Sequence, residues 1–170
     1  MPLIRRSERA TPRDPLTPQQ RKDAAAVGLR RPGVLDASWR MGAVTWKALR
    51  REMRILLRTR ARERGRYTYA ELAADADARG HPYLDPHGEE MADMLRQLDL
   101  LELQQGLPMI SAIVVQEHGE SRPGPGFANL ARDLGLDVAE DEAIVLAFWL
   151  SEMGECHRAW AYRDVMAGLH

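Results

Sequence analysis

The sequence predicts a mainly helical fold with a small β-sheet, and three observations carry that prediction. Apolar residues recur at helical spacing through most of the chain after Ser38, whereas only two short segments are rich in β-branched or aromatic residues. Proline and glycine gather between the periodic segments, where they end helices and form turns. The 170 residues, 45% of them hydrophobic and 29% charged, are enough for one domain with an extension.

Residues 1–36 are expected to form a flexible, basic, proline-rich arm. Five prolines and eight basic residues occur there with few large apolar side chains, so burial could not offset the entropy of ordering this segment. Thr17 and Gln20 nevertheless fit a capping box for a short helix, with Pro18 at its first position. Residues 37–170 are expected to form a single mostly helical domain with a C-terminal helix.

A basic amphipathic helix is predicted from Ser38 to about Arg64. The apolar side chains that share one face are Trp46, Leu49, Met53, Leu56 and Leu57. The basic side chains, offset to another face, are Lys47, Arg50, Arg51, Arg54, Arg58 and Arg62. Because both sets repeat at the helical period, the apolar face is expected to cover the core and the basic face to meet solvent or a partner. Gly65 is expected to end the helix as its C-terminal cap.

The rest of the domain is expected to contain further helices and a buried strand. The helices are predicted over 68–78, 85–105, 127–134 and 140–160, and the strand over 109–115. A capping box formed by Thr68 and Glu71 starts the first of these helices, after the β-prone Tyr67-Thr68-Tyr69. Pro123-Gly124-Pro125-Gly126-Phe127 predicts a rigid turn that places Phe127 in the core, with a recognition loop as the alternative.

Charge is divided between the two halves of the chain. Residues 1–66 carry 18 of the 24 Lys and Arg and 6 of the 25 Asp and Glu, a balance of +12, while residues 67–170 have a balance of −13. Such asymmetry predicts a polyanionic partner, or head-to-tail contact between the halves.

The order helix, short strand, helix, helix, strand and glycine-rich turn is that of a winged helix. Within it, Tyr67-Thr68-Tyr69-Ala70-Glu71-Leu72-Ala73 resembles the opening segment of the DNA-binding domain of alkylguanine-DNA alkyltransferases and alkyltransferase-like proteins. Leu107-Pro108-Met109-Ile110 followed by Gly124-Pro125-Gly126-Phe127 is similar to that family's strand and glycine-aromatic wing. The chain also resembles small bacterial proteins with a Pro-x-x-Ser-Ala-x-Val-Val strand and a Pro-Gly-x-Gly-Phe loop. The resemblance covers roughly residues 66–127 and implies a winged-helix core that associates with DNA.

Two departures from that family limit what the resemblance implies. Where the alkyltransferases have a Pro-Cys-His-Arg segment with their nucleophile, this chain reads Met109-Ile110-Ser111-Ala112, so alkyl transfer is not implied. Cys156-His157-Arg158 repeats three residues of that segment, but it lies in a predicted helix. Adjacent side chains of a helix point about 100° apart, so Cys156 and His157 would make a poor nucleophile–base pair. The helix in the recognition position, 85–105, has a net charge of −5 and would be repelled by a duplex.

The sequence therefore predicts a non-enzymatic, cytoplasmic regulator or accessory protein that associates with nucleic acid through its basic helix and arm. The residues expected to bind nucleic acid or another polyanion are Lys47, Arg50, Arg51, Arg54, Arg58, Arg62 and Arg122. The alternative is an interaction or assembly module that docks its basic half on an acidic surface, that of a second copy included. No catalytic residue, cofactor, metal or membrane contact is assigned, because the sequence has no converging catalytic set, a single cysteine and no apolar run of about 20 residues.

Overall fold

The computed structural model describes residues 14–36, 38–117, 122–136, 138 and 141–169, so the first 13 residues of the expected arm lie outside it. The described residues are mainly helical with one small sheet, which confirms the predicted fold class. In chain order the elements are α1 (Pro18–Leu29), η1 (Trp39–Met41), α2 (Ala43–Arg62), β1 (Tyr67–Thr68), α3 (Tyr69–Ala78), α4 (Glu89–Gln104), η2 (Ile110–Ile113), β2 (Val114–Val115), α5 (Pro125–Asp133) and α6 (Glu142–Trp160), where η marks a 3₁₀ helix.

The first helix, α1, is packed into the domain. Thr17 caps it through the predicted box, in which Thr17 and Gln20 each accept a hydrogen bond from the other's backbone N–H. The alanine-rich face of α1 is buried and the helix packs against α4, while Arg21 is buried in an ion pair with Glu152 of α6. This packing corrects the expectation of a flexible arm through residue 36, because small side chains and one internal partner fix α1 in place.

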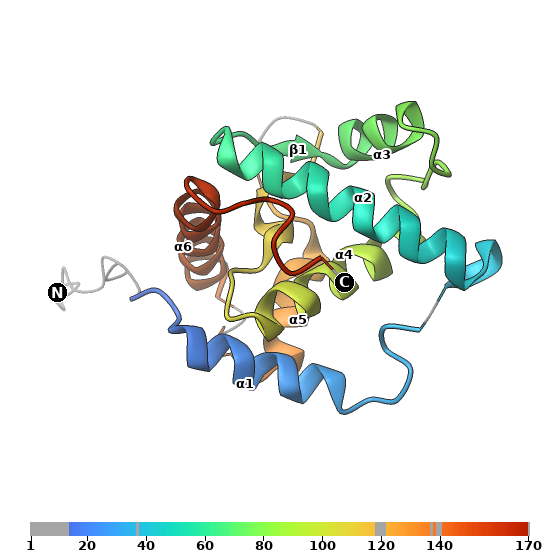
Figure 1. The fold of residues 1–170 in the computed structure, drawn as a ribbon. Helices are drawn as coiled ribbons and strands as arrows, with labels where there is room; N and C mark the ends of the chain where they lie inside the picture. The colour runs from blue at the N-terminus through green and yellow to red at the C-terminus, as the bar shows by residue number, and fades with distance from the viewer. Residues whose placement is uncertain (1–13, 37, 118–121, 137, 139–140, 170) are drawn as a thin grey trace, which may run out of the picture.

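The basic amphipathic helix, α2, lies on the opposite side of the molecule from α1, with α4 between them (Figure 1). Its apolar face is buried as predicted, but its end differs from the prediction. The left-handed residue after the helix is Arg64, with φ 58°, whereas Gly65 donates its N–H to the Arg60 carbonyl at 2.9 Å. A Cβ atom on Gly65 would lie 2.6 Å from the Arg60 Cδ, so a larger residue there would have to displace the Arg60 side chain.

The two strands pair in parallel, with Tyr67 opposite Val114 and Thr68 opposite Val115. The segment predicted as a strand over 109–115 is buried throughout, but only its last two residues are extended and Ile110–Ile113 form η2. Side-chain carboxylates explain the difference. Glu152 accepts the Met109 N–H and Asp99 accepts the Ser111 N–H, so these donors are bound to side chains and not to a neighbouring strand.

The remaining helices follow the predicted pattern with shifted ends. The capping box of Thr68 and Glu71 starts α3, as expected. Helix α4 begins at Glu89, later than predicted, after a turn in which the Asp85 carboxylate accepts the His87 N–H. The glycine- and proline-rich segment enters α5 directly and places Phe127 in the core, where its ring lies 5.6 Å from that of Phe148.

Helix α4 lies at the centre of the fold, where it contacts α1, α2, α5 and η2. Helix α6 packs against α2 and η2. Together these contacts join the N-terminal and C-terminal parts of the chain into one hydrophobic core. Among the helices that the structure describes, none is both long enough and apolar enough to span a membrane.

Candidate functional site

The seven cations predicted to bind a polyanion do not share one surface. Three of them are exposed side chains of α2, namely Lys47, Arg51 and Arg62. The Arg62 guanidinium donates to the Arg163 carbonyl at the surface, at 3.5 Å. Arg122 is also exposed and forms an ion pair of 2.7 Å with Glu142. These four side chains remain accessible to a partner.

Arg54 and Arg58 lie inside the protein, with 3% and 0% of their surface exposed. The Glu102 Oε1 accepts hydrogen bonds from both Nε atoms, at 2.7 Å from Arg54 and 2.8 Å from Arg58. Arg58 also donates to two carbonyl groups of the segment after α6 and lies over the Trp160 ring. In this structure neither arginine can contact an external polyanion, which corrects the expectation that they belong to an exposed basic face.

Arg50 is half-buried and donates hydrogen bonds to the Leu35 carbonyl and to Gln97. Burial is the main cause that lowers the pKa of Arg50, with the nearby Arg54 charge adding to it. The internal ion pairs all join the basic half of the chain to its acidic half. Part of the charge asymmetry is therefore satisfied within one molecule, by the head-to-tail contact that the sequence left open as an alternative.

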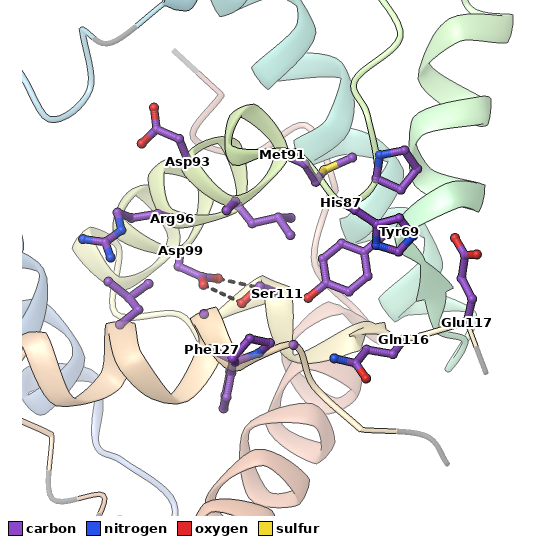
Figure 2. A pocket seen from close by; sticks show the side chains of 18 residues that line it. Tyr69, His87, Met91, Asp93, Arg96, Asp99, Ser111, Gln116, Glu117 and Phe127 are labelled. Carbon is purple, nitrogen blue, oxygen red and sulfur yellow. Dashed lines mark hydrogen bonds between the residues drawn. The ribbon is translucent and has the colours of Figure 1, made fainter. Parts of the chain in front are cut away.

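A cavity of about 680 Å³ opens between α3, α4, the end of β2 and the start of α5 (Figure 2). We call it the Asp99 cavity. Its apolar walls include Met91 and Leu95 of α4 and Phe127 and Leu130 of α5. The polar side chains that line it are Tyr69, His87, Asp93, Arg96, Asp99, Ser111, Gln116 and Glu117.

Asp99 and Ser111 form the floor of this cavity. The Ser111 hydroxyl donates to Asp99 Oδ2 at 2.5 Å, and the Ser111 backbone N–H donates to Oδ1 at 2.9 Å (Figure 2). Asp99 is 1% exposed and Ser111 is 7% exposed. The two hydrogen bonds fix the carboxylate at the point where η2 begins and orient it beside the hydroxyl.

Burial raises the pKa of Asp99 from 3.8 to about 7. The two hydrogen bonds from Ser111 favour the carboxylate and oppose this shift, whereas the negative charges of Glu152 and Glu102 add to it. Asp99 is therefore close to half-protonated at neutral pH. A carboxyl group whose charge is so easily changed is common where proteins bind ligands.

Tyr69 closes one side of the cavity, with its hydroxyl directed towards Ser111 (Figure 2). A hydrogen bond from the Gly124 backbone reaches this hydroxyl, but burial dominates and raises the pKa of Tyr69. Tyr69 therefore stays a neutral phenol that can donate its proton to a ligand. A Cβ atom on Gly124 would lie 2.2 Å from the Tyr69 hydroxyl oxygen, so only glycine allows this contact.

The sequence analysis missed Asp99 and Ser111 as site residues. One signal was present, since Asp99 is a single acidic residue with Leu98 directly before it and Leu100 and Leu101 directly after it. Cys156 is fully buried and its thiol donates to the Met109 carbonyl at 3.2 Å. Burial raises the pKa of the Cys156 thiol, so this cysteine packs as a small apolar side chain.

Comparisons of this chain with protein-family models, with curated proteins and with solved structures found no match. Within the described ranges, the fold gathers no group of three or more potential metal-ligating side chains. The Asp99 cavity and the exposed cations of α2 are therefore the candidate sites of this structure.

Proposed function

We propose that the protein binds a small molecule in the Asp99 cavity. The observation that carries this proposal is the cavity itself, with a volume of about 680 Å³, apolar walls and a polar floor of Asp99 and Ser111. Ligand sites in proteins commonly have volumes of roughly 300–1,000 Å³ and combine apolar walls with a few oriented polar groups. The floor is fixed by hydrogen bonds before any ligand arrives, which lowers the entropy cost of binding.

Occlusion of the cavity tests this function. Ala92 is an exposed residue of α4 that lines the cavity, whereas Ala26 is an exposed residue of α1 away from it. Fragments that bind the wild-type protein in ligand-observed NMR should lose binding to Ala92→Trp and keep it with Ala26→Trp. Equal binding to both variants would place the fragments elsewhere and remove the proposal.

A second candidate function, association with nucleic acid or another polyanion, is supported by the exposed cations Lys47, Arg51 and Arg62 on α2. Phosphate contacts release counterions, so each one adds about 0.9 to the slope of log affinity against log salt on duplex DNA. Neutralising all three with glutamine should therefore lower that slope by up to about 3 in a fluorescence anisotropy titration.

The control is the variant Arg79→Gln with Arg158→Gln, which removes exposed charge at the end of α3 and on α6. An equal loss per charge removed would mean that only net charge matters, and binding that does not depend on salt would reject the polyanion function. Salt-sensitive self-association in light scattering, without DNA binding, would instead support the assembly module that docks basic on acidic surfaces.

A further inference from the structure

Three buried carboxylates, those of Asp99, Glu102 and Glu152, lie in the interior near one another, and two of them are paired with arginine. Glu102 accepts from Arg54 and Arg58 at 2.7 and 2.8 Å, and Glu152 accepts from Arg21 at 2.7 Å. All five of these side chains are almost fully excluded from solvent. Each of these two carboxylates therefore has the opposite charge that burial requires.

Asp99 is the third carboxylate, and it differs from the other two in its partners. Within the described part of the chain, its hydrogen bonds come from the neutral backbone and hydroxyl of Ser111. The charges of Glu152 and Glu102 oppose its ionisation, and the two hydrogen bonds from Ser111 favour it. Asp99 is also the carboxylate of the three that lines the cavity. A ligand in the cavity can therefore supply the charge that the protein does not.

The cavity floor presents hydrogen-bond acceptors. Ser111 donates its hydroxyl proton to Asp99, so the lone pairs of the Ser111 oxygen remain available, and each oxygen of the ionised Asp99 carboxylate has a second lone pair. A ligand group with N–H or O–H donors therefore fits this floor when Asp99 is ionised. An ammonium group brings up to three donors and the missing positive charge.

The charges around the cavity also favour a cation. Its lining includes Asp93, Asp99 and Glu117, against the single arginine Arg96, whose guanidinium lies 3.5 Å from Asp133. An anionic ligand would meet repulsion from three carboxylates and would have to lose its hydration at an acceptor floor. A cationic ligand would be attracted by the same carboxylates.

The walls suit the apolar body of such a ligand. Phe127 and Tyr69 contribute aromatic rings, and Met91 contributes a flexible thioether that adapts to the shape of a ligand. An aromatic face also attracts a positive charge that approaches it.

We propose that the Asp99 cavity binds an organic amine in its protonated form, with the ammonium group on the floor of Asp99 and Ser111 and the apolar body against Met91 and Phe127. This inference rests on the proposed small-molecule function. It adds the chemical class of the ligand and the residue that selects it.

A linked change in protonation follows from this placement. A bound cation favours ionised Asp99, so binding near neutral pH should release a proton, and affinity should rise between about pH 6 and pH 8. His87 also lines the cavity, so the pH series is repeated in His87→Gln. The titratable and charged groups that face Asp99 or its cavity are Tyr69, His87, Asp93, Arg96, Glu102, Glu117 and Glu152.

One scaffold in three charge states tests the proposal. Benzylamine, benzyl alcohol and benzoate are titrated into the ¹⁵N-labelled protein, and the shifts of the Ser111 and Gln116 amides report binding. Benzylamine, protonated at neutral pH, should bind about tenfold or more tightly than benzyl alcohol, since a charge-assisted contact is worth at least about 1.5 kcal/mol. Benzoate should bind most weakly.

The Asp99→Asn variant should remove the preference and bring benzylamine close to benzyl alcohol. Its matched control, Asp77→Asn, neutralises an exposed carboxylate of α3 away from the cavity and should leave the preference unchanged. If Asp99→Asn does not fold, the pH series in the wild-type protein measures the role of Asp99: the preference for benzylamine over benzyl alcohol should grow as the pH rises through about 7, and a preference that does not change with pH would overturn the proposal.

The outcomes separate the two proposals. Equal binding of benzylamine and benzyl alcohol in the cavity would overturn the amine ligand and leave the small-molecule function standing. Tighter binding of benzoate would overturn it as well. Fragments of this size are expected to bind at roughly 10 mM. If none of the three compounds changes the amide chemical shifts of Ser111 and Gln116 at that concentration, the proposed small-molecule function itself fails.

Discussion

Arg58 and Glu102 form an ion pair of 2.8 Å in which neither side chain is exposed to solvent. The same carboxylate oxygen also accepts a hydrogen bond from Arg54, so a single acidic residue of α4 is the shared counterion of two guanidinium groups of α2. Removal of one member of a buried pair leaves an uncompensated charge in the interior, which destabilises far more than the pair itself stabilises. The contact between α2 and α4 therefore depends on Glu102.

Glu102→Gln should lower the free energy of unfolding by about 3–5 kcal/mol, because both arginines would lose their counterion. The control is Glu155→Gln, which removes a surface pair with Arg158 and should change stability by about 0–1 kcal/mol. Urea denaturation of both variants at neutral pH measures the difference. Similar values for the two would show that the interior pair is hydrated in solution.

Asp99 should make the protein less stable as pH rises. Its pKa is raised from 3.8 to about 7 by folding, so between these values the native state holds a proton that the unfolded chain has lost. The free energy of unfolding therefore falls from about pH 4 to about pH 7 and levels off above that. Relative to the wild type, Asp99→Asn should gain stability across this range in urea denaturation. If the difference in unfolding free energy between Asp99→Asn and the wild type did not change with pH, it would contradict the burial of an ionisable Asp99.

Two neighbouring glycines should respond differently to alanine. Gly124→Ala places a Cβ atom 2.2 Å from the Tyr69 hydroxyl oxygen, so the ring must move, with a loss of about 1–3 kcal/mol and weaker ligand binding. Gly126→Ala meets nothing within 4 Å and should be neutral or stabilising by up to about 1 kcal/mol. Thermal denaturation and fragment binding compare them. A harmless Gly124→Ala would show that Tyr69 does not keep this position.

Two tryptophans provide a test of the core. Trp46 is 1% exposed and donates to Gln97 at 3.0 Å, so Trp46→Ala should cost about 3–5 kcal/mol. Trp39 is 42% exposed and donates to Asp93, so Trp39→Ala should cost less than about 1 kcal/mol. Urea denaturation measures both, and a near-neutral Trp46→Ala would mean that α2 does not cover the core in solution.

Features that depend on a few neighbouring residues could be predicted from the sequence. The capping boxes at Thr17 and Thr68 lie within one helical turn of their partners, and both are present as expected. The apolar face of α2 was also predictable, because helical spacing alone places Trp46 and Leu49 together. Local geometry therefore determines where helices form and which face they bury.

The interior charges could not be predicted in the same way. Arg58 lies eleven residues after Lys47, which puts both on one helical face, yet Lys47 is exposed and Arg58 is covered by the segment after α6. Its partner Glu102 is 44 residues away along the chain. Helical periodicity places side chains on a face but does not show which other segment will cover that face.

Asp99 shows the same limit for the candidate site. The sequence places it in a helix with an acidic excess, which suggested only repulsion of a duplex. Its position depends on the backbone N–H and the hydroxyl of Ser111 in η2, a segment that was predicted to be a strand. Only the three-dimensional packing of α4 on η2 shows that this carboxylate is buried, faces a cavity and has no arginine partner among the described residues.

The ion pair between Arg21 and Glu152 joins the first and last helices across 131 positions of the chain. Forming a contact between residues so far apart in the sequence has a high entropic cost of loop closure. The ion pair therefore stabilises the protein little until the elements between its two residues are in place. The helices from α2 to α6 should therefore assemble first, and α1 should dock onto α4 late in folding. The segment that begins the described chain would then be among the last to reach its native position, and the first to leave it when the protein unfolds.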